Sequence, residues 1–307
     1  MTDRPGWPGA GRNPGRAPAV IAIGLAAVAL AASVSACAGP AAPPAASSAS
    51  QPSGQPASLP AASTPDIPGL PGEAGQGTSP ASPATGPDAL PLAGKIIGID
   101  PGHNGGNFSD PGAIAHLVWN GTAWETCDTT GTTTDGGYRE AQFTFDVARY
   151  LRADLRRDGA RVVMTRTSNN GVGPCVDRRA QIINDAHANV AVDIHADGGP
   201  ASGRGFTVLE PVADGPNDTV IAASQRLGAD VRQAMLAGTA MPVSDYVGVD
   251  GIMPRDDLAG LNLTTVPKVL IECGNMRNAT DAGLLVTARF QQQVASALTA
   301  AVVRFLG

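Results

Sequence analysis

Hydrophobic and polar residues follow two different patterns along residues 95–307. Short apolar runs that end at turn residues are typical of buried strands, and they occur at 95–100, 161–165, 190–195, 205–209 and 268–273. Apolar residues four positions apart are typical of amphipathic helices, and they occur at 141–158, 174–188, 218–237 and 287–306. Because strands and helices alternate, we predict a single α/β domain with helices on both faces of a twisted, mostly parallel central sheet of about six strands.

The first 37 residues have the pattern of an export signal. Three arginines precede an apolar run at 19–32, which is too short to span a bilayer comfortably. The sequence VSAC, which ends at Cys37, follows this run and resembles the bacterial lipobox, in which the signal is cut before the cysteine and the cysteine is lipidated. We therefore predict a lipoprotein-type signal at residues 1–37 with Cys37 as the lipidated residue. The alternatives are an ordinary signal peptide with an incidental cysteine and a retained N-terminal anchor.

Residues 38–92 are rich in alanine, proline, serine and glycine, and they contain only three charged residues. Such a segment cannot bury enough apolar surface to offset the entropy lost on ordering. We predict a disordered linker that reaches about 40 Å as a flexible coil, or about 170 Å if it is extended like polyproline. It would join a lipid anchor to a folded domain at residues 93–307. We therefore expect an exported protein held on the outer face of the cell membrane, in the cell-wall space.

Composition narrows the range of partners. The chain has a net charge of −6 and only 4% aromatic residues, whereas a nucleic-acid binder requires a cationic surface. The acidic balance also argues against a polybasic membrane patch, which leaves the N-terminal lipid as the membrane contact. Four cysteines are too few for a disulfide-built mini-protein. We expect a monomer.

Residues that can bind a metal stand at the ends of the predicted strands. His103 follows the first strand, His195 ends the third, Glu272 lies near the end of the last, and Glu140 opens the first helix. Sites in open α/β sheets form beyond the carboxyl ends of the strands. Two histidines and one carboxylate are the ligand set of a hydrolytic zinc site, and a second carboxylate can serve as base. The spacing forms no compact motif, so a structural role for each residue stays open at this point.

Four separated segments resemble the zinc-dependent N-acetylmuramoyl-L-alanine amidase family, type 3. They are IIGIDPGHNGG at 96–106, GYREAQF at 137–143, VDIHADG at 192–198 and VLIECGNMRNATDAGLL at 269–285, and RDDLAGLNL at 255–263 resembles its actinobacterial branch. The resemblance implies an α/β fold, one zinc ion held by His103, Glu140 and His195, and Glu272 as the catalytic acid and base. The substrate it implies is peptidoglycan, cut at the amide between N-acetylmuramic acid and L-alanine.

Two departures from the family pattern leave these ligands in place: Asn104 where a glycine is frequent, and Cys273-Gly274-Asn275 after Glu272. The stretch between His195 and Glu272 leaves no room for an extra autoinhibitory helix, so we expect open access to the zinc. Two other functions remain as alternatives. One is a non-catalytic cell-wall-binding lipoprotein of the same fold, and the other is a zinc peptidase that cuts stem peptides.

The remaining cysteines and histidines are expected to be structural. Cys127 and Cys175 lie in loops of the exported part, where an oxidising compartment allows a disulfide between them. Cys273 is expected to be an inert core thiol, although a nucleophilic role is the alternative. We expect His116 and His187 to have structural or rim positions. Asp100 could orient His103 or cap the turn that follows it. The long segment 107–137 has neither periodic pattern, and such loops are often functional.

Overall fold

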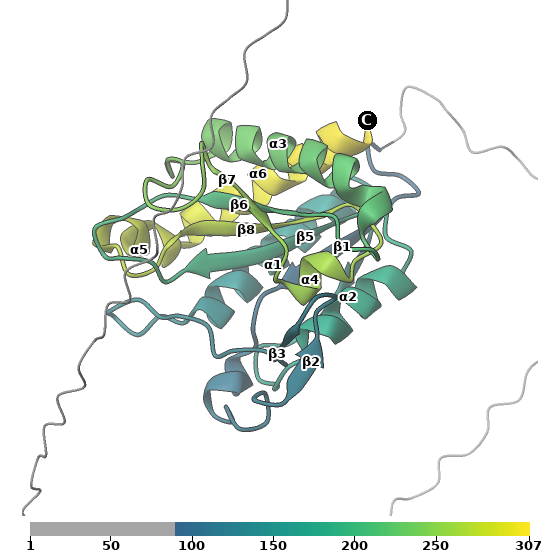
Figure 1. Cartoon of the computed structure of the whole chain (residues 1–307). Coiled ribbons are helices and arrows are strands. Elements are labelled where there is room, and N and C mark those ends of the chain that lie inside the picture. The colour runs from purple at the N-terminus through teal and green to yellow at the C-terminus, as the bar shows by residue number, and fades with distance from the viewer. Residues whose placement is uncertain (1–89) are drawn as a thin grey trace, which may run out of the picture. The chain divides into compact units, whose positions relative to one another are not determined.

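Six strands form the central sheet of the computed structural model, which describes residues 90–307 (Figure 1). The strands are β1 Ile96–Pro101, β4 Arg161–Met164, β5 Val190–Asp197, β6 Thr207–Pro211, β7 Ile252–Arg255 and β8 Lys268–Asn275. Their order is β4-β1-β5-β8-β6-β7, and β4, β1, β5 and β8 run parallel. β6 is antiparallel to β8, and β7 is parallel to β6. The predicted fold class, a mostly parallel sheet of about six strands, is confirmed.

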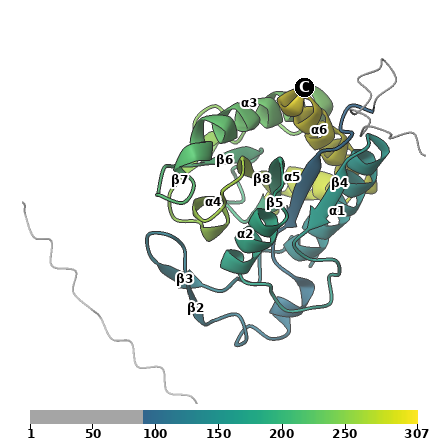
Figure 2. The ribbon, with the colours of Figure 1, turned by 90° about the vertical axis from the view of Figure 1, so that its right-hand side faces the viewer.

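Helices cover both faces of this sheet. The helices are α1 Glu140–Arg157, α2 Val176–Asp185, α3 Ile221–Gly238, α4 Ala259–Asn262, α5 Ala279–Leu285 and α6 Ala288–Leu306. Alternate strand residues point to opposite faces. Ile97, Val192 and Ile271 belong to a large core with α1, α3 and α6, whereas Ala191 and Leu270 pack near α2 and α4. Figure 2 shows α1 and α6 on one side of the sheet and α2 and α4 on the other.

The folded part begins slightly before the predicted boundary at residue 93. Leu92 is fully buried in the main core, and its N–H donates to the carbonyl of Asp158 at the end of α1. Gly159, at φ +94°, lies against Leu90, where a larger side chain would collide. Leu90–Leu92 therefore belong to the domain. The predicted signal, Cys37 and the rest of the predicted linker lie outside the described residues.

Several short elements are missed by the hydrophobic pattern. The segment 107–137 contains a hairpin of β2 Leu117–Trp119 and β3 Trp124–Thr126, after the 3-10 turn Gly105–Phe108. The edge strand β7 and the four-residue helix α4 are also unpredicted, and a 3-10 turn at Asp218–Val220 precedes α3. β7 contains Pro254, which a sheet tolerates at its edge. Within residues 90–307, no helix is long and apolar enough to cross a bilayer.

Candidate metal centre

The four side chains predicted to carry the chemistry meet near the carboxyl ends of the central strands. His195 on β5 and Glu272 on β8 are partners in the register of adjacent parallel strands, so both project from the same face of the sheet. His103 follows the end of β1, and Glu140 is the first residue of α1. The fold thus unites residues that lie in four separate segments of the sequence.

The backbone around His103 allows unusually close packing. His103 has φ +55°, in the left-handed region that residues with a side chain rarely adopt. A side chain at Gly102 would collide with the ring of His195. At Gly131, with φ +70°, a side chain would press on both His103 and Glu140. These two glycines let two imidazoles and one carboxylate approach each other.

Glu140 lies between the two histidines. Its Oε1 lies 2.9 Å from Nδ1 of His195, and its Oε2 lies 3.3 Å from Nε2 of His103. Backbone N–H groups of Thr132 and Ala196 also donate to this carboxylate, at 2.9 and 3.2 Å. One ligand atom from each of the three side chains lies within 4.8 Å of the others. The arrangement therefore presents two nitrogens and one oxygen to a common point.

Charges within this group shift each pKa. Burial opposes ionisation of Glu140, but the adjacent histidines outweigh it and hold the pKa of its carboxyl well below the usual range. Burial disfavours the imidazolium of His103, yet the charge of Glu140 and the hydrogen bond to Asp128 raise its pKa to about 9. The pKa of His195 is also raised, because contacts with Asp193 and Glu140 outweigh burial. Two imidazole nitrogens and one carboxylate oxygen are a donor set that suits zinc, which binds the deprotonated forms of these groups.

Glu272 differs from Glu140 in its surroundings. Burial, together with the charges of Glu140 and Asp197, raises its pKa to about 8, although His195 acts in the opposite direction. Its buried Oε2 has no hydrogen-bond partner among residues 90–307. A carboxyl group with a pKa near neutrality can both accept and donate a proton in one reaction cycle. Glu272 is the register partner of His195 and lines the same cavity.

A chain of buried charges runs beneath the candidate ligands, and its first half begins at His103. Nδ1 of His103 lies 3.0 Å from Oδ1 of Asp128, whose Oδ2 lies 3.3 Å from Arg179 on α2. Arg179 in turn contacts Oδ1 of Asp100 at 2.9 Å. Of the two roles considered for Asp100, direct orientation of His103 is therefore wrong. Asp128 orients this ring, and Asp100 is two contacts further along the chain.

The second half of the chain returns to His195. Nζ of Lys268 lies 2.8 Å from Oδ2 of Asp100 and 3.0 Å from Oδ2 of Asp193. Oδ1 of Asp193 lies 3.3 Å from Nε2 of His195. Burial opposes ionisation of Asp100, but Lys268 and Arg179 hold its pKa well below the usual range. The ion pairs thus form a continuous chain from Nδ1 of His103 to Nε2 of His195, in which carboxylates alternate with basic groups. These are the two ring nitrogens that do not contact Glu140.

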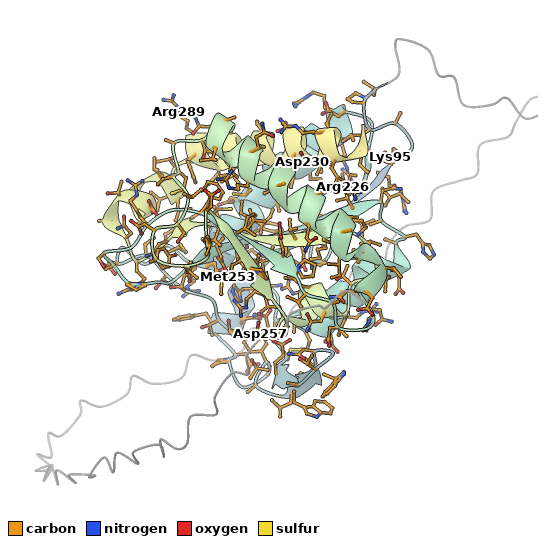
Figure 3. All side chains as sticks on the ribbon, turned by 45° about the horizontal axis from the view of Figure 1, so that its top comes forward. Lys95, Arg226, Asp230, Met253, Asp257 and Arg289 are labelled. Atoms are coloured by element: carbon orange, nitrogen blue, oxygen red, sulfur yellow. A yellow bond between two sulfur atoms is a disulfide. The ribbon has the colours of Figure 1, made fainter. Side chains whose placement is uncertain are left out.

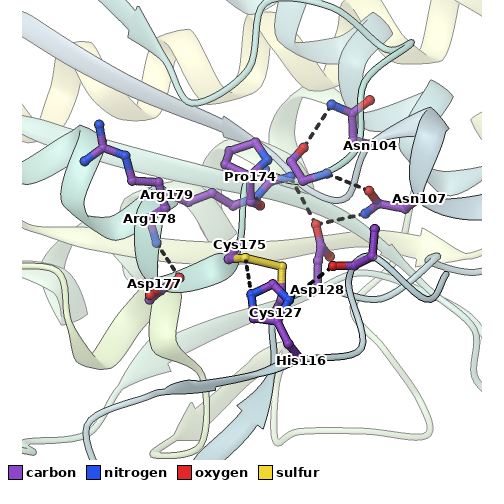
Figure 4. Close-up of a disulfide and its surroundings, with 12 residues drawn as sticks. Asn104, Asn107, His116, Cys127, Asp128, Pro174, Cys175, Asp177, Arg178 and Arg179 are labelled. Carbon is purple, nitrogen blue, oxygen red and sulfur yellow. Dashed lines mark hydrogen bonds and ion pairs between the residues drawn. A yellow bond between two sulfur atoms is a disulfide. The ribbon is translucent and has the colours of Figure 1, made fainter. Parts of the chain in front are cut away.

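The expected disulfide joins Cys127 to Cys175, as Figure 4 shows. It connects the end of the hairpin to the start of α2, next to Asp128 and Arg179. Nε2 of His116 lies 3.4 Å from the sulfur of Cys175, outside the candidate metal centre. Cys273 is fully buried as a free thiol, and burial raises its pKa well above the usual value, which disfavours a nucleophilic role.

A cavity of about 390 Å³ opens above the four residues. From the long segment without periodicity, its lining includes Glu125, Thr126, Asp128, Thr129, Gly131 and Thr132. Arg255, the region 258–261 around α4 and Leu270 of β8 also line it. Asp257, labelled in Figure 3, pairs with Arg255 at 2.6 Å on this rim. The cavity has room for a substrate larger than a single amino acid.

Comparison with known proteins agrees with this geometry. Residues 97–304 match the family described as N-acetylmuramoyl-L-alanine amidase. The chain belongs to this amidase family. Over 215 residues it is 40% identical to N-acetylmuramoyl-L-alanine amidase Rv3717 of Mycobacterium tuberculosis, and the match covers 70% of this chain and 88% of the relative.

Solved structures of two mycobacterial relatives share the fold of this amidase. The N-acetylmuramyl-L-alanine amidase Ami1 from Mycobacterium smegmatis is 40% identical with a TM-score of 0.66, over 70% of this chain and 98% of that structure. Ami1 from Mycobacterium abscessus is 39% identical with the same TM-score, over 70% of this chain and all of that structure. The predicted family and its actinobacterial branch are thereby confirmed.

Proposed function

We propose that this amidase cleaves the amide between N-acetylmuramic acid and L-alanine in peptidoglycan with the help of one zinc ion. Family membership supports the reaction. The convergence of His103, Glu140 and His195 near Glu272, whose Oε2 has no hydrogen-bond partner among residues 90–307, supports zinc-dependent catalysis. Nε2 of His103, the carboxylate of Glu140 and Nδ1 of His195 would hold the ion. Bound there, zinc supplies Lewis-acid activation of the scissile carbonyl and of water.

The chain itself supplies proton transfer and orientation. Glu272 removes a proton from the attacking water and then delivers it to the nitrogen of the leaving amine, which leaves poorly until it is protonated. Burial raises the pKa of Glu272 toward neutral pH, where a carboxyl group can both take up and release a proton. Asp128 and Asp193 contact the outer nitrogens of His103 and His195, and such contacts keep ligand rings oriented.

Product analysis tests the proposal. The purified protein, with zinc, is incubated with a muramyl peptide, and the products are identified by mass spectrometry. The expected result is a free muramyl sugar together with an intact stem peptide. Cut peptides would indicate a zinc peptidase, and the absence of any product with retained wall binding would indicate a non-catalytic lipoprotein. Either outcome overturns the proposal.

The protein would work from the outer face of the cell membrane. Residues 1–37 are proposed as a lipoprotein signal with lipid on Cys37, and residues 38–89 as the greater part of a linker. The VSAC sequence after a short apolar run supports the signal, and the nearly uncharged composition of the following segment supports the linker. We propose that the folded domain is a monomer with peptidoglycan as its partner.

A further inference from the structure

The β2–β3 hairpin carries two exposed tryptophans on one face. Trp119 and Trp124 are opposite each other in the strand register, with ring centroids 5.6 Å apart in an edge-to-face arrangement. Their exposed fractions are 45% and 65%, and Leu117 on the same face is 58% exposed. Nothing in the packing of residues 90–307 requires large aromatic side chains at these exposed positions.

This face borders the substrate cavity at one residue, Thr126 of β3. Glu125 also lines the cavity, but it lies on the opposite face of the hairpin, with Val118. Thr126 and Trp124 are two residues apart on one strand, so they lie on the same face about 7 Å from each other. That separation is comparable with the length of one sugar unit. A polymeric substrate that enters the cavity past Thr126 along this face would therefore pass over Trp124.

The hairpin is held firmly at its base. Val118, on the opposite face from the tryptophans, is buried in a small cluster with Ile114 and Cys127. Immediately after β3, Cys127 is bonded to Cys175 at the start of α2. Figure 4 shows this bond between the two segments. The tryptophan face is therefore attached covalently to a helix of the catalytic domain.

The tip and the cavity side of the hairpin are also held. The side-chain oxygen of Asn120 accepts hydrogen bonds from the N–H groups of Thr122 and Ala123, and its amide donates to the carbonyl of Asp257. Glu125 accepts a hydrogen bond at 2.8 Å from the N–H of Ala259, at the start of α4. A surface that is already ordered loses little entropy when it binds a ligand.

The charge around the hairpin favours a neutral ligand over an anionic membrane. The carboxylate of Asp214 lies against Gly121 in the hairpin turn. Backbone carbonyls of Asp256 and Asp257 accept hydrogen bonds from Thr122 and Asn120, which places both residues close to the tip, although the charge of Asp257 is compensated by Arg255. An anionic lipid surface would be repelled there, whereas sugar hydroxyls can donate hydrogen bonds to carboxylates.

We propose that Trp119 and Trp124 form a platform that binds the glycan strand of peptidoglycan beside the muramyl residue whose stem peptide is cut. The C–H groups of a pyranose ring stack on the electron-rich face of an indole. This inference rests on the proposed function, because the same cavity must hold the muramyl peptide. It assigns the exposed aromatic face to recognition of polymeric rather than fragmentary substrate.

Fluorescence provides a binding test that is independent of catalysis. The chain has three tryptophans, Trp7, Trp119 and Trp124, so in a full-length Trp7→Phe protein both remaining indoles are on the hairpin. Titration with oligomers of N-acetylglucosamine, which are neutral and carry no stem peptide, should change the indole emission in a saturable way. Trp124→Ala in this background should weaken binding about tenfold, and Trp124→Phe should restore most of it.

Turnover provides the second test. The double variant Trp119→Ala/Trp124→Ala should lose about tenfold more kcat/KM on long glycan strands than on a single muramyl peptide. Leu236→Ala, which removes a 45% exposed apolar side chain from α3, is the matched control. It should preserve the wild-type ratio of the two substrates. Zinc content and thermal unfolding of each variant show whether it is folded.

The results separate the inference from the proposed function. The wild type could bind the glycan without cutting any substrate, and the variants could lose that binding. This result would support the platform and overturn the proposed amidase reaction. Equal loss on both substrates, or unchanged glycan affinity in the double variant, overturns the platform. Loss of binding only to anionic lipid vesicles, or dissociation of a dimer, would assign the face to a membrane or to a second copy and also overturns it.

Discussion

Lys268 and Asp193 form a buried ion pair directly beneath the candidate metal centre. Nζ of Lys268 lies 3.0 Å from Oδ2 of Asp193, and the lysine side chain is 1% exposed. Burial disfavours a charged lysine, but Asp100 and Asp193 outweigh it and raise the pKa of Lys268. The pair belongs to the charge chain that connects the two histidines. Its contribution is therefore measurable in both stability and metal affinity.

Replacing Lys268 should destabilise the domain strongly. In Lys268→Met, Asp100 and Asp193 lose their shared cation and remain buried, which should lower the free energy of unfolding by about 3–5 kcal/mol. Zinc affinity should also fall by about 10–100-fold, because Asp193 is no longer held toward His195. Urea unfolding and chelator competition measure the two effects. Adding Asp100→Asn to the Lys268→Met protein should recover part of the lost stability. If Lys268→Met lowers the free energy of unfolding by less than about 1 kcal/mol, the charge of Lys268 is unimportant for stability.

Measurement of bound zinc should distinguish variants of the three proposed ligands from variants of Glu272. His103→Ala, Glu140→Ala and His195→Ala should each lose bound zinc, because each removes one of three ligands. Glu272→Gln should retain one zinc ion per chain while its turnover falls by about 10²–10⁴-fold, because only proton transfer is removed. Elemental analysis together with a turnover assay checks this. A metal-free Glu272→Gln protein would show that the residue is a ligand.

The disulfide should contribute substantially to stability. Cys127 and Cys175 are 48 positions apart in the sequence, and on the chain-entropy estimate their bond stabilises the folded state by up to about 4 kcal/mol. The Cys127→Ser/Cys175→Ser protein should therefore unfold at lower urea concentration. Non-reducing peptide mapping should find the two cysteines linked and Cys273 free. Alkylation of all three thiols without a reductant would contradict the expectation.

Glu210 should make stability depend on pH. It lies on β6 against Gly228 of α3, and burial raises its pKa from 4.5 to about 6. The folded state thus binds this proton more tightly than the unfolded state, so the stabilisation is complete below pH 4.5 and is lost as pH rises through about 6.

Glu210→Gln isolates this contribution. At a pH of about 7.5 the variant should be more stable than the wild type by about 1 kcal/mol or less, since partial solvent screening reduces the effect. At low pH the two proteins should be equally stable. Urea unfolding across the pH range measures the difference, and a pH-independent change would assign the effect to packing instead.

Cys37 should determine where the protein resides. Cys37→Ser should move the protein from the membrane fraction to the soluble fraction while its turnover of small fragments stays unchanged, because stable anchoring requires acyl chains. Shortening residues 38–89 should reduce lysis of intact walls first, because the linker sets the reach of the domain. A mature protein that is soluble with an unmodified Cys37 would end the lipoprotein interpretation.

Local sequence patterns predicted many of the strands and helices of this protein. Buried strands such as β5 and β8 and the amphipathic helices α1 and α6 follow from spacing along the sequence, because side-chain periodicity depends only on the local backbone. The family motifs also pointed to His103, Glu140, His195 and Glu272, since each motif is a short contiguous segment of the sequence. The hairpin and β7 could not be predicted, because strands of three or four residues are too short to show a period.

The charge chain and the aromatic platform were decided only by the tertiary structure. A lysine at the start of an apolar run is ordinarily expected at the surface. Lys268 can be buried because Asp100, 168 positions away in the sequence, and Asp193 meet it across neighbouring strands. In the same way, Trp119 and Trp124 become one face beside a cavity only when β2 pairs with β3 and β3 lies against α4. Sequence spacing reports the conformation of each segment, whereas the energy of a buried charge depends on partners that only the folded chain brings within contact.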